Sequence, residues 1–333
     1  MHPLRTANAL LLTLALGIPA AAQPPPEPRE RLPKQPLEYE RHAETVKQNN
    51  EAPSQQKLPP LRSRSLQEAL AAWRAAGATT TPGLSFSWGE FLAPKDVYFV
   101  AVQIMAAPEV GLVAGQKATL FGEVNGPRGA WVLSLEVERP VEVSRDRVYL
   151  DVPLDLAPGE YLAHLGIAQG GTVKGFVGSY LAPQEIAPRT FGLSRLMISD
   201  NVFPLPAKQE PDQPFAFGGI KVVPRSDGIF HPSSEAWLFL VVRSPSAEAG
   251  GTPQLGAKVT IIGPEGPSST KRELKVQDPA AIALQGFEHQ FGLGLPLTLT
   301  ALPAGGYQVE VVVIDLAEGN AQSSSSSFTL ARP

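Results

Sequence analysis

The segment WVLSLEVE, residues Trp131 to Glu138, has an apolar side chain at every second position from Trp131 to Val137, and three of the four residues between and after these positions are polar. A period of two is the spacing of side chains on one face of a β-strand, so this segment predicts a strand with one buried face. Similar runs surround it, and the dipeptides Asn125-Gly126 and Gly170-Gly171 between them are typical of tight turns. The predicted strands of this half are 97–105, 117–124, 131–138, 147–152, 160–168 and 172–181.

A second series of strands follows Ala182 to Arg189, a proline-containing stretch that we interpret as a domain boundary. Within it, Ala236 to Val242 (AWLFLVV) is apolar at every position, which predicts a central strand covered on both faces. We interpret the serine run Ser323 to Ser327 as a solvated strand edge. The predicted strands are 193–198, 219–223, 236–243, 257–262, 270–276, 295–300, 307–314 and 326–330.

The two halves share the pattern Leu-x-x-Gly-x-Tyr, once at Leu156 to Tyr161 and once at Leu302 to Tyr307. Each copy opens an alternating strand, and we predict that Tyr161 and Tyr307 form the structural tyrosine corners of immunoglobulin-like sandwiches. The predicted fold class is therefore all-β: two tandem immunoglobulin-like or fibronectin-III-like antiparallel sandwiches, at 84–182 and 190–333, with one short N-terminal helix.

The composition agrees with this fold class and excludes one class of partner. The 333 residues include 30 glycines and 34 prolines, which suits many short strands joined by turns. Apolar residues make up 43% of the chain, enough to bury sizeable cores. The formal net charge is −4, so the sequence offers no basic surface to nucleic acid or to anionic lipid.

The N-terminus predicts export. A polar start with Arg5 is followed by an apolar run from Ala9 to Ile18, and Ala20-Ala21-Ala22 supplies the small residues of a cleavage site. We interpret residues 1–22 as a signal peptide, because ten apolar residues do not span ~30 Å of hydrocarbon. The chain contains no cysteine, so the cysteine-linked lipid anchor of lipoproteins is excluded. The expected location is the periplasm, the cell surface or the medium.

Between this peptide and the first strands we predict a tether and a helix. Residues 23–64 hold nine prolines and fourteen charged residues, a composition typical of a disordered Pro-rich tether. Residues 65–77 then predict a docking helix, with Ser65 as its N-cap, Glu68 in a capping box and Gly77 at its end. Its apolar face is expected to pack on the first sandwich.

Motifs that carry chemistry are absent from the sequence. There is no Gly-x-Ser-x-Gly elbow, no His-Glu-x-x-His, no phosphate-binding glycine loop and no calcium loop. None of the histidines lies at metal-ligand spacing from another; His231 with Asp227 is the most suggestive local pair for a site. We therefore predict no catalytic, cofactor-binding or metal-binding residues and no cofactor, and we keep His231 and Asp227 as surface candidates.

Trp88 is the third surface candidate, in the aromatic segment SFSWGEF that precedes the first predicted strand. Exposed aromatic rings of this kind stack on sugars. The alternative, which we favour, is that these rings cover the end of the first sandwich.

Three stretches of the second half resemble a known family. Leu193 to Asp200, Phe215 to Arg225 with Phe230, and Leu302 to Asp315 look like the accessory β-domains of exported GWxTD-containing and von Willebrand factor A-related proteins of Acidobacteria-like bacteria. The resemblance covers about half of the chain. Neither diagnostic module is present, because the sequence holds no Gly-Trp-x-Thr-Asp and no Asp-x-Ser-x-Ser motif. The resemblance implies fold and compartment and assigns no functional residues.

Two hypotheses for function follow. The first is a non-enzymatic protein of the bacterial envelope that binds or scaffolds a protein or envelope partner through its sandwiches, for example by accepting a partner strand at a sheet edge. The second is a secreted carbohydrate-active or hydrolytic protein with a site that the sequence hides. A concave pocket with converging carboxylates, or His231 beside an acid, favours the second.

Overall fold

The computed structural model describes residues 61–92, 98–126, 131–154, 156, 159–182, 190–205, 214–217, 219–247, 253–264, 271–277, 281–283, 289–300 and 302–332. The chain divides into two compact units, 1–37 and Glu38–Pro333, and every described residue belongs to the second. The predicted signal peptide, most of the predicted tether, and residues 183–189 of the predicted boundary lie outside the described residues.

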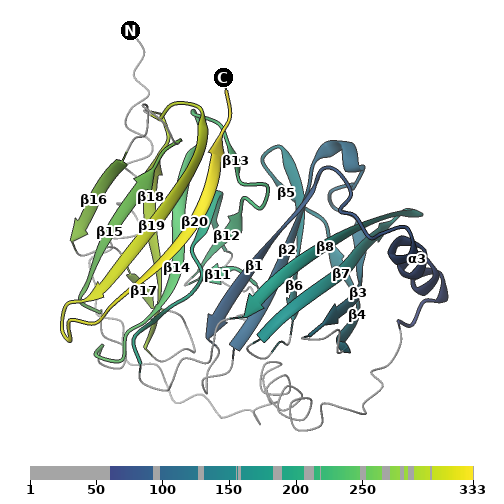
Figure 1. Cartoon of the computed structure of the whole chain (residues 1–333), viewed down its shortest axis with the longest axis horizontal. Coiled ribbons are helices and arrows are strands. Elements are labelled where there is room, and N and C mark those ends of the chain that lie inside the picture. The colour runs from purple at the N-terminus through teal and green to yellow at the C-terminus, as the bar shows by residue number, and fades with distance from the viewer. Residues whose placement is uncertain are drawn as a thin grey trace, which may run out of the picture. The chain divides into compact units, whose positions relative to one another are not determined.

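The protein is all-β with one short helix, as its sequence predicts (Figure 1). Two four-stranded antiparallel sheets form the first sandwich. One has the order β1-β2-β6-β5, with strands Leu84–Leu92, Tyr98–Ala106, Arg147–Leu154 and Glu142–Ser144. The other has the order β4-β3-β7-β8, with strands Trp131–Pro140, Lys117–Asn125, Gly159–Gln169 and Thr172–Ala182.

Two larger sheets form the second sandwich. The first has the order β11-β12-β10-β14-β18-β17, with strands Ala216–Phe217, Ile220–Pro224, Met197–Pro204, Glu235–Arg243, Gln290–Thr298 and Ala281–Ala283; β9, Gly192–Leu193, also pairs with β14. The second has the order β13-β20-β19-β15-β16, with strands Ile229–Phe230, Ala321–Leu330, Gly305–Asp315, Leu255–Ile262 and Lys271–Gln277. The short β13 runs parallel to β20, and the other described pairs are antiparallel.

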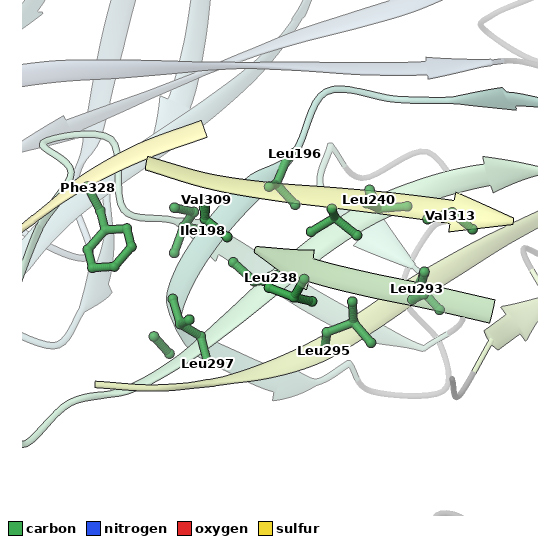
Figure 2. Packing of buried hydrophobic residues seen from close by; sticks show 14 of the residues in the cluster. Leu196, Ile198, Leu238, Leu240, Leu293, Leu295, Leu297, Val309, Val313 and Phe328 are labelled. Atoms are coloured by element: carbon green, nitrogen blue, oxygen red, sulfur yellow. The ribbon is translucent and has the colours of Figure 1, made fainter. Parts of the chain in front are cut away.

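Alternation along the strands builds the two cores. The segment WVLSLEVE forms most of β4, and Leu135 points into the first core with Leu120 and Leu165 of the neighbouring strands. The second core forms where inward residues of β14 and β18 meet those of β19 and β20. Figure 2 shows this packing, with side chains from both sheets labelled.

Strand β14 confirms the prediction of a central strand covered on both faces. Leu238 and Leu240 point into the second core, whereas Phe239 and Val241 pack into a separate apolar cluster on the opposite face. The sequence pattern missed β1 and β5 in the first sandwich and the short strands β11, β13 and β17 in the second. Strand β1 lies in the aromatic segment without clear periodicity, and β5 has only three residues.

The predicted docking helix is α3, Arg64–Ala75, with an additional 3₁₀ turn η2, Pro108–Val110, further along the chain. Its N-cap is Ser63, whose hydroxyl accepts a hydrogen bond from the Leu66 amide at 3.4 Å, so the assignment of the cap to Ser65 is wrong. Gly77 follows the helix with a φ of +94° and ends it as predicted.

Helix α3 packs on the outer face of the β4-β3-β7-β8 sheet, as predicted. Leu70 of the helix is buried with Phe121 of β3, and the Trp73 ring lies where a side chain at Gly175 of β8 would stand. Arg74 forms an ion pair of 2.6 Å with Glu123 of β3. The helix is therefore fixed by tertiary contacts, which a helix of 12 residues needs because its intrinsic stability in water is marginal.

Candidate functional site

Trp88 is part of the first hydrophobic core. It lies on β1, its exposed fraction is 6%, and its ring meets that of Phe86 edge-on at a centroid distance of 6.2 Å. Its assignment as a surface candidate is therefore wrong. The reason is that SFSWGEF is itself a strand, on which every second side chain turns inward.

Asp227 is paired with arginines and not with His231. The Asp227 carboxylate accepts hydrogen bonds from Nε of Arg225 at 2.8 Å, from Nε of Arg147 at 3.3 Å, and from the Ile229 amide at 3.0 Å. His231 is exposed in the turn that follows β13. Asp227 is therefore part of a group of ion pairs, and His231 lies at the surface.

The two predicted corner tyrosines are both buried. Tyr307 donates a hydrogen bond of 2.5 Å from its hydroxyl to the carbonyl of Pro303, four residues upstream, which is the bond of a tyrosine corner. The Tyr161 ring folds back over Gly159, and burial raises the pKa of its hydroxyl. The carbonyls where its own corner bond is expected, at 157 and 158, lie outside the described residues.

The first sandwich contacts the second through the outer face of β2 and β6. Residues 100–106 of β2 are at most 1% exposed, so this strand is covered on both faces. Ala101 packs with Phe239 and Val222 of the second sandwich, and Met105 and Tyr149 pack with Val223. We call this contact, together with the ion pairs described next, the joint.

Arg225 is the centre of the charged part of the joint. Its side chain is 3% exposed, and Nη1 and Nη2 bind the two Asp146 oxygens at 2.7 and 3.4 Å. Nη1 also bonds Asp200 at 3.3 Å, and Nε bonds Asp227. Asp146 lies at the tip of the β5–β6 hairpin, so one arginine of the second sandwich holds a loop of the first.

Two further arginines from the same hairpin balance the charge. Arg147 reaches Asp227 at 3.3 Å, and Arg145 donates from Nε to the Asp200 carbonyl at 2.6 Å. Arg145 has a φ of +52°, a left-handed conformation that costs energy for a residue with a Cβ. Three arginines therefore face three aspartates, and the strained tip is held by the partners it meets.

The environments of these carboxylates differ. The hydrogen bond from Arg225 lowers the pKa of Asp146, which is half-exposed. Burial raises the pKa of Asp200 against the opposing effect of Arg225. Similarly, burial raises the pKa of Asp151, which pairs with Lys221 across the joint. These are the properties of structural ion pairs, because each of the three carboxylates is paired with a basic side chain of the protein.

A second polar cluster closes the far end of β14 and tests the hydrolase hypothesis. Asp315 accepts hydrogen bonds from the hydroxyls of Ser244 at 2.9 Å and Ser246 at 2.5 Å, and from the Ala317 amide at 3.0 Å. The nearby His289 bonds the Ala247 carbonyl through Nδ1 at 2.8 Å. A nucleophilic triad needs the histidine between acid and serine, and here the Asp315 carboxylate accepts hydrogen bonds from the serine hydroxyls directly.

Among the described residues, no group of three or more His, Cys, Asp or Glu side chains is arranged to hold a metal ion. In the same part of the chain, no helix is long and apolar enough to cross a membrane.

Strand β20 contains the serine run Ser323 to Ser327 and lies near the edge of its sheet. From Gly305 to Ile314, β19 pairs with β20 without a register shift, and on the other side β13 pairs only with Thr329 and Leu330 (Figure 1). We call Ala321–Ser327 the free edge. Its odd-numbered side chains are exposed.

The direction of the main-chain groups on the free edge follows from its neighbour. The amide of Thr329 donates to the Gly228 carbonyl beside β13, at 2.7 Å, so it points away from β19. Because strand geometry repeats every two residues, the amides and carbonyls of Ser323, Ser325 and Ser327 point the same way. Within the described residues they have no backbone partner.

Comparisons with known proteins give no family for this chain. No family model and no curated protein matches the sequence. Among solved structures, trypsin-activated α2-macroglobulin from Escherichia coli is similar over 76% of this chain at 13% identity, with a TM-score of 0.22. The native conformation of the same E. coli protein gives 13% identity, 76% coverage and a TM-score of 0.21. The chain spans only 16% and 14% of those chains, and we draw no functional argument from them.

Proposed function

We propose that this protein is an exported, non-enzymatic protein of the bacterial envelope, which binds or scaffolds a partner by accepting a β-strand at the free edge of β20. The single observation that carries the proposal is the row of main-chain amides and carbonyls at Ser323, Ser325 and Ser327, to which no backbone group of the described residues is hydrogen-bonded. In strand addition, these main-chain groups supply the affinity.

The free edge lacks the features by which proteins block such pairing. From Ala321 to Leu330 there is no charged residue, no proline and no bulge, whereas most exposed edges carry at least one of these. At the opposite end of the same sheet, β16 has the sequence KRELKVQ, in which four of seven residues are charged. One edge strand of this sheet is therefore rich in charged residues, whereas the free edge has none.

Two further observations support a scaffold. The joint buries both faces of β2 and pairs its charges, which favours a rigid connection between the sandwiches. The apolar run from Ala9 to Ile18 and the alanines before Gln23 support export. The resemblance to accessory β-domains of exported bacterial proteins adds to the same proposal.

The test is capture of envelope proteins by the immobilised protein and by two variants at one position. Ser325→Pro removes an amide that points away from β19, so it blocks an incoming strand and leaves the β19–β20 ladder intact. Ser325→Thr is the matched control, because it keeps the amide on the same strand. We expect a stoichiometric species to bind the wild type and Ser325→Thr and to bind Ser325→Pro at least tenfold more weakly. Equal binding by all three proteins would overturn the proposal.

A further inference from the structure

The free edge of β20 has a defined length. At one end, β13 already occupies the positions beside Thr329 and Leu330. At the other end, the chain enters the turn after β19, where the Asp315 carboxylate binds the amides of Ala317 and Glu318. An incoming strand therefore has seven residues, 321–327, to pair with.

The side chains of this stretch, AQSSSSS, are small or uncharged. Most partner strands carry at least one bulky or charged residue in seven, and these would have to fit the surroundings of β20. A second copy of Ala321–Ser327 introduces no charged residue and no bulky apolar residue. In an antiparallel arrangement centred on Ser324, every residue of 321–327 meets another residue of 321–327, so neither like charges nor bulky side chains oppose each other, and facing serines can hydrogen-bond.

The main-chain geometry also fits a two-fold axis. The residues whose amides and carbonyls point outward are the odd-numbered ones, and hydrogen-bonded pairs of an antiparallel ladder must join two such residues. With an axis at Ser324, Ala321 faces Ser327 and Ser323 faces Ser325, which uses the whole free edge. With an axis at Ser325, that residue faces itself and Ser323 faces Ser327. The first arrangement pairs the outward groups of all four odd-numbered residues. The second pairs those of Ser323, Ser325 and Ser327 and leaves Ala321 unpaired, because Ala321 would face Thr329, which β13 already occupies.

The inner side of the free edge is already held in place. The Leu196 amide bonds the Ser324 hydroxyl at 2.9 Å, and the Gln322 side chain bonds the Phe191 carbonyl at 2.9 Å. These contacts involve the side chains of the even-numbered residues Gln322 and Ser324 and leave the outward main-chain groups as they are. The edge is thus ordered before it meets a partner, which lowers the entropy cost of pairing.

We propose that the strand added to the free edge is β20 of a second copy of this chain, paired antiparallel, so that two five-stranded sheets join edge to edge in a two-fold dimer. This inference rests on the proposed function and names its partner. The interface is isologous, because the same patch of both subunits meets itself.

Single cysteines test the arrangement, since the natural chain has none. Facing residues of a hydrogen-bonded antiparallel pair lie about 5.5 Å apart at Cα, within the ~4.4–6.8 Å that a disulfide spans. Under mild oxidation of the full chain, we expect a disulfide-linked dimer either of Ser325→Cys with itself or of Ser325→Cys mixed with Ser323→Cys. A cysteine at Ser85, on β1 of the other sandwich, is the control and should not cross-link above background.

The mass of the unmodified protein in solution provides the second measurement. We expect wild type and Ser325→Thr to show twice the mass of one chain by light scattering, and Ser325→Pro to show the mass of one chain. Circular dichroism and the urea midpoint of Ser325→Pro establish that it is folded.

The outcomes separate the two proposals. A monomeric wild type whose cysteine variants do not cross-link would overturn the dimer. If that monomer still captured a partner in a Ser325-dependent manner, the proposed function would stand with a different strand as occupant. If Ser325→Pro altered neither mass nor capture, both proposals would fall.

Discussion

The joint and the free edge of β20 differ in how their strands are covered and charged. At the joint, β2 and β6 are covered by the second sandwich, and the charges around Arg225 are matched three against three. At the free edge, Ala321–Ser327 carries no charge, and among the described residues its outward main-chain groups have no backbone partner. The difference teaches that this protein uses charge to fix its own architecture, whereas the edge at which we propose association is uncharged.

The largest effect is expected from breaking the joint at its centre. Arg225→Ala leaves Asp146, Asp200 and Asp227 with only two arginines, and removing one partner from a buried ion pair costs about 3–5 kcal/mol. We expect the lower end, about 3 kcal/mol, because solvent screens the half-exposed Asp146. Urea unfolding measures the change. Arg64→Ala is the control, since the Arg64–Glu68 pair is exposed, and it should leave the midpoint unchanged. A shift of equal size in both variants would contradict the central role of Arg225.

A smaller loss of stability is expected when the hydroxyl of Tyr307, which lies against β20, is removed. Tyr307→Phe removes the corner bond to Pro303 and keeps the ring, which stacks on Phe328 of β20 at a centroid distance of 5.1 Å. We expect a loss of about 1 kcal/mol in the free energy of unfolding, the usual net value of one hydrogen bond. The urea midpoint is again the measurement. An unchanged midpoint would show that the hydroxyl does not stabilise β19.

The two carboxylates on Arg225 should respond to pH with opposite signs. The folded-state pKa of Asp146 is lowered, so its contribution to stability is present above the ordinary value of 3.8 and is lost as pH falls through the folded value. The folded-state pKa of Asp200 is raised by burial, so the native state binds a proton more readily and gains stability as pH falls towards 3.8. Asp146→Asn should therefore flatten the loss of stability in acid, and Asp200→Asn should remove the gain just above pH 3.8. A pH series of urea midpoints checks both, and slopes of the same sign would refute the assignment.

The smallest effect on stability is expected at the free edge itself. Ser325→Lys adds a charge to an exposed side chain that makes no contact needed for folding, so the free energy of unfolding should change by no more than about 0.5 kcal/mol. The same variant should weaken association, because a lysine on an edge strand opposes pairing. Urea unfolding beside light scattering distinguishes the two effects. A large loss of stability would mean that the outward face of β20 is part of the fold.

The sequence by itself determined the fold class and the course of most strands, because a period of two in WVLSLEVE or an unbroken run in AWLFLVV reports directly which faces are buried. It also placed the helix before the first strand and marked Tyr307, whose corner bond to Pro303 the structure shows. These features depend on neighbours in the chain, which a sequence displays.

Only the tertiary structure decided what the charged residues do. Asp146 and Arg225 lie 79 residues apart, and each stands in a turn, where charged residues are ordinary. Asp227 looks like a partner for His231 in the sequence, yet two arginines hold it in the fold. Trp88 could be read in the sequence as an exposed ring or, as we favoured, as a ring covering the end of the first sandwich, and strand pairing places it in the core. The serine run could be read as an edge from its composition, but the direction of its free amides followed only from the single short strand, β13, that ends beside it. The physical reason is common to all four: burial, ion pairing and strand neighbours are set by contacts between distant segments, which no local pattern encodes.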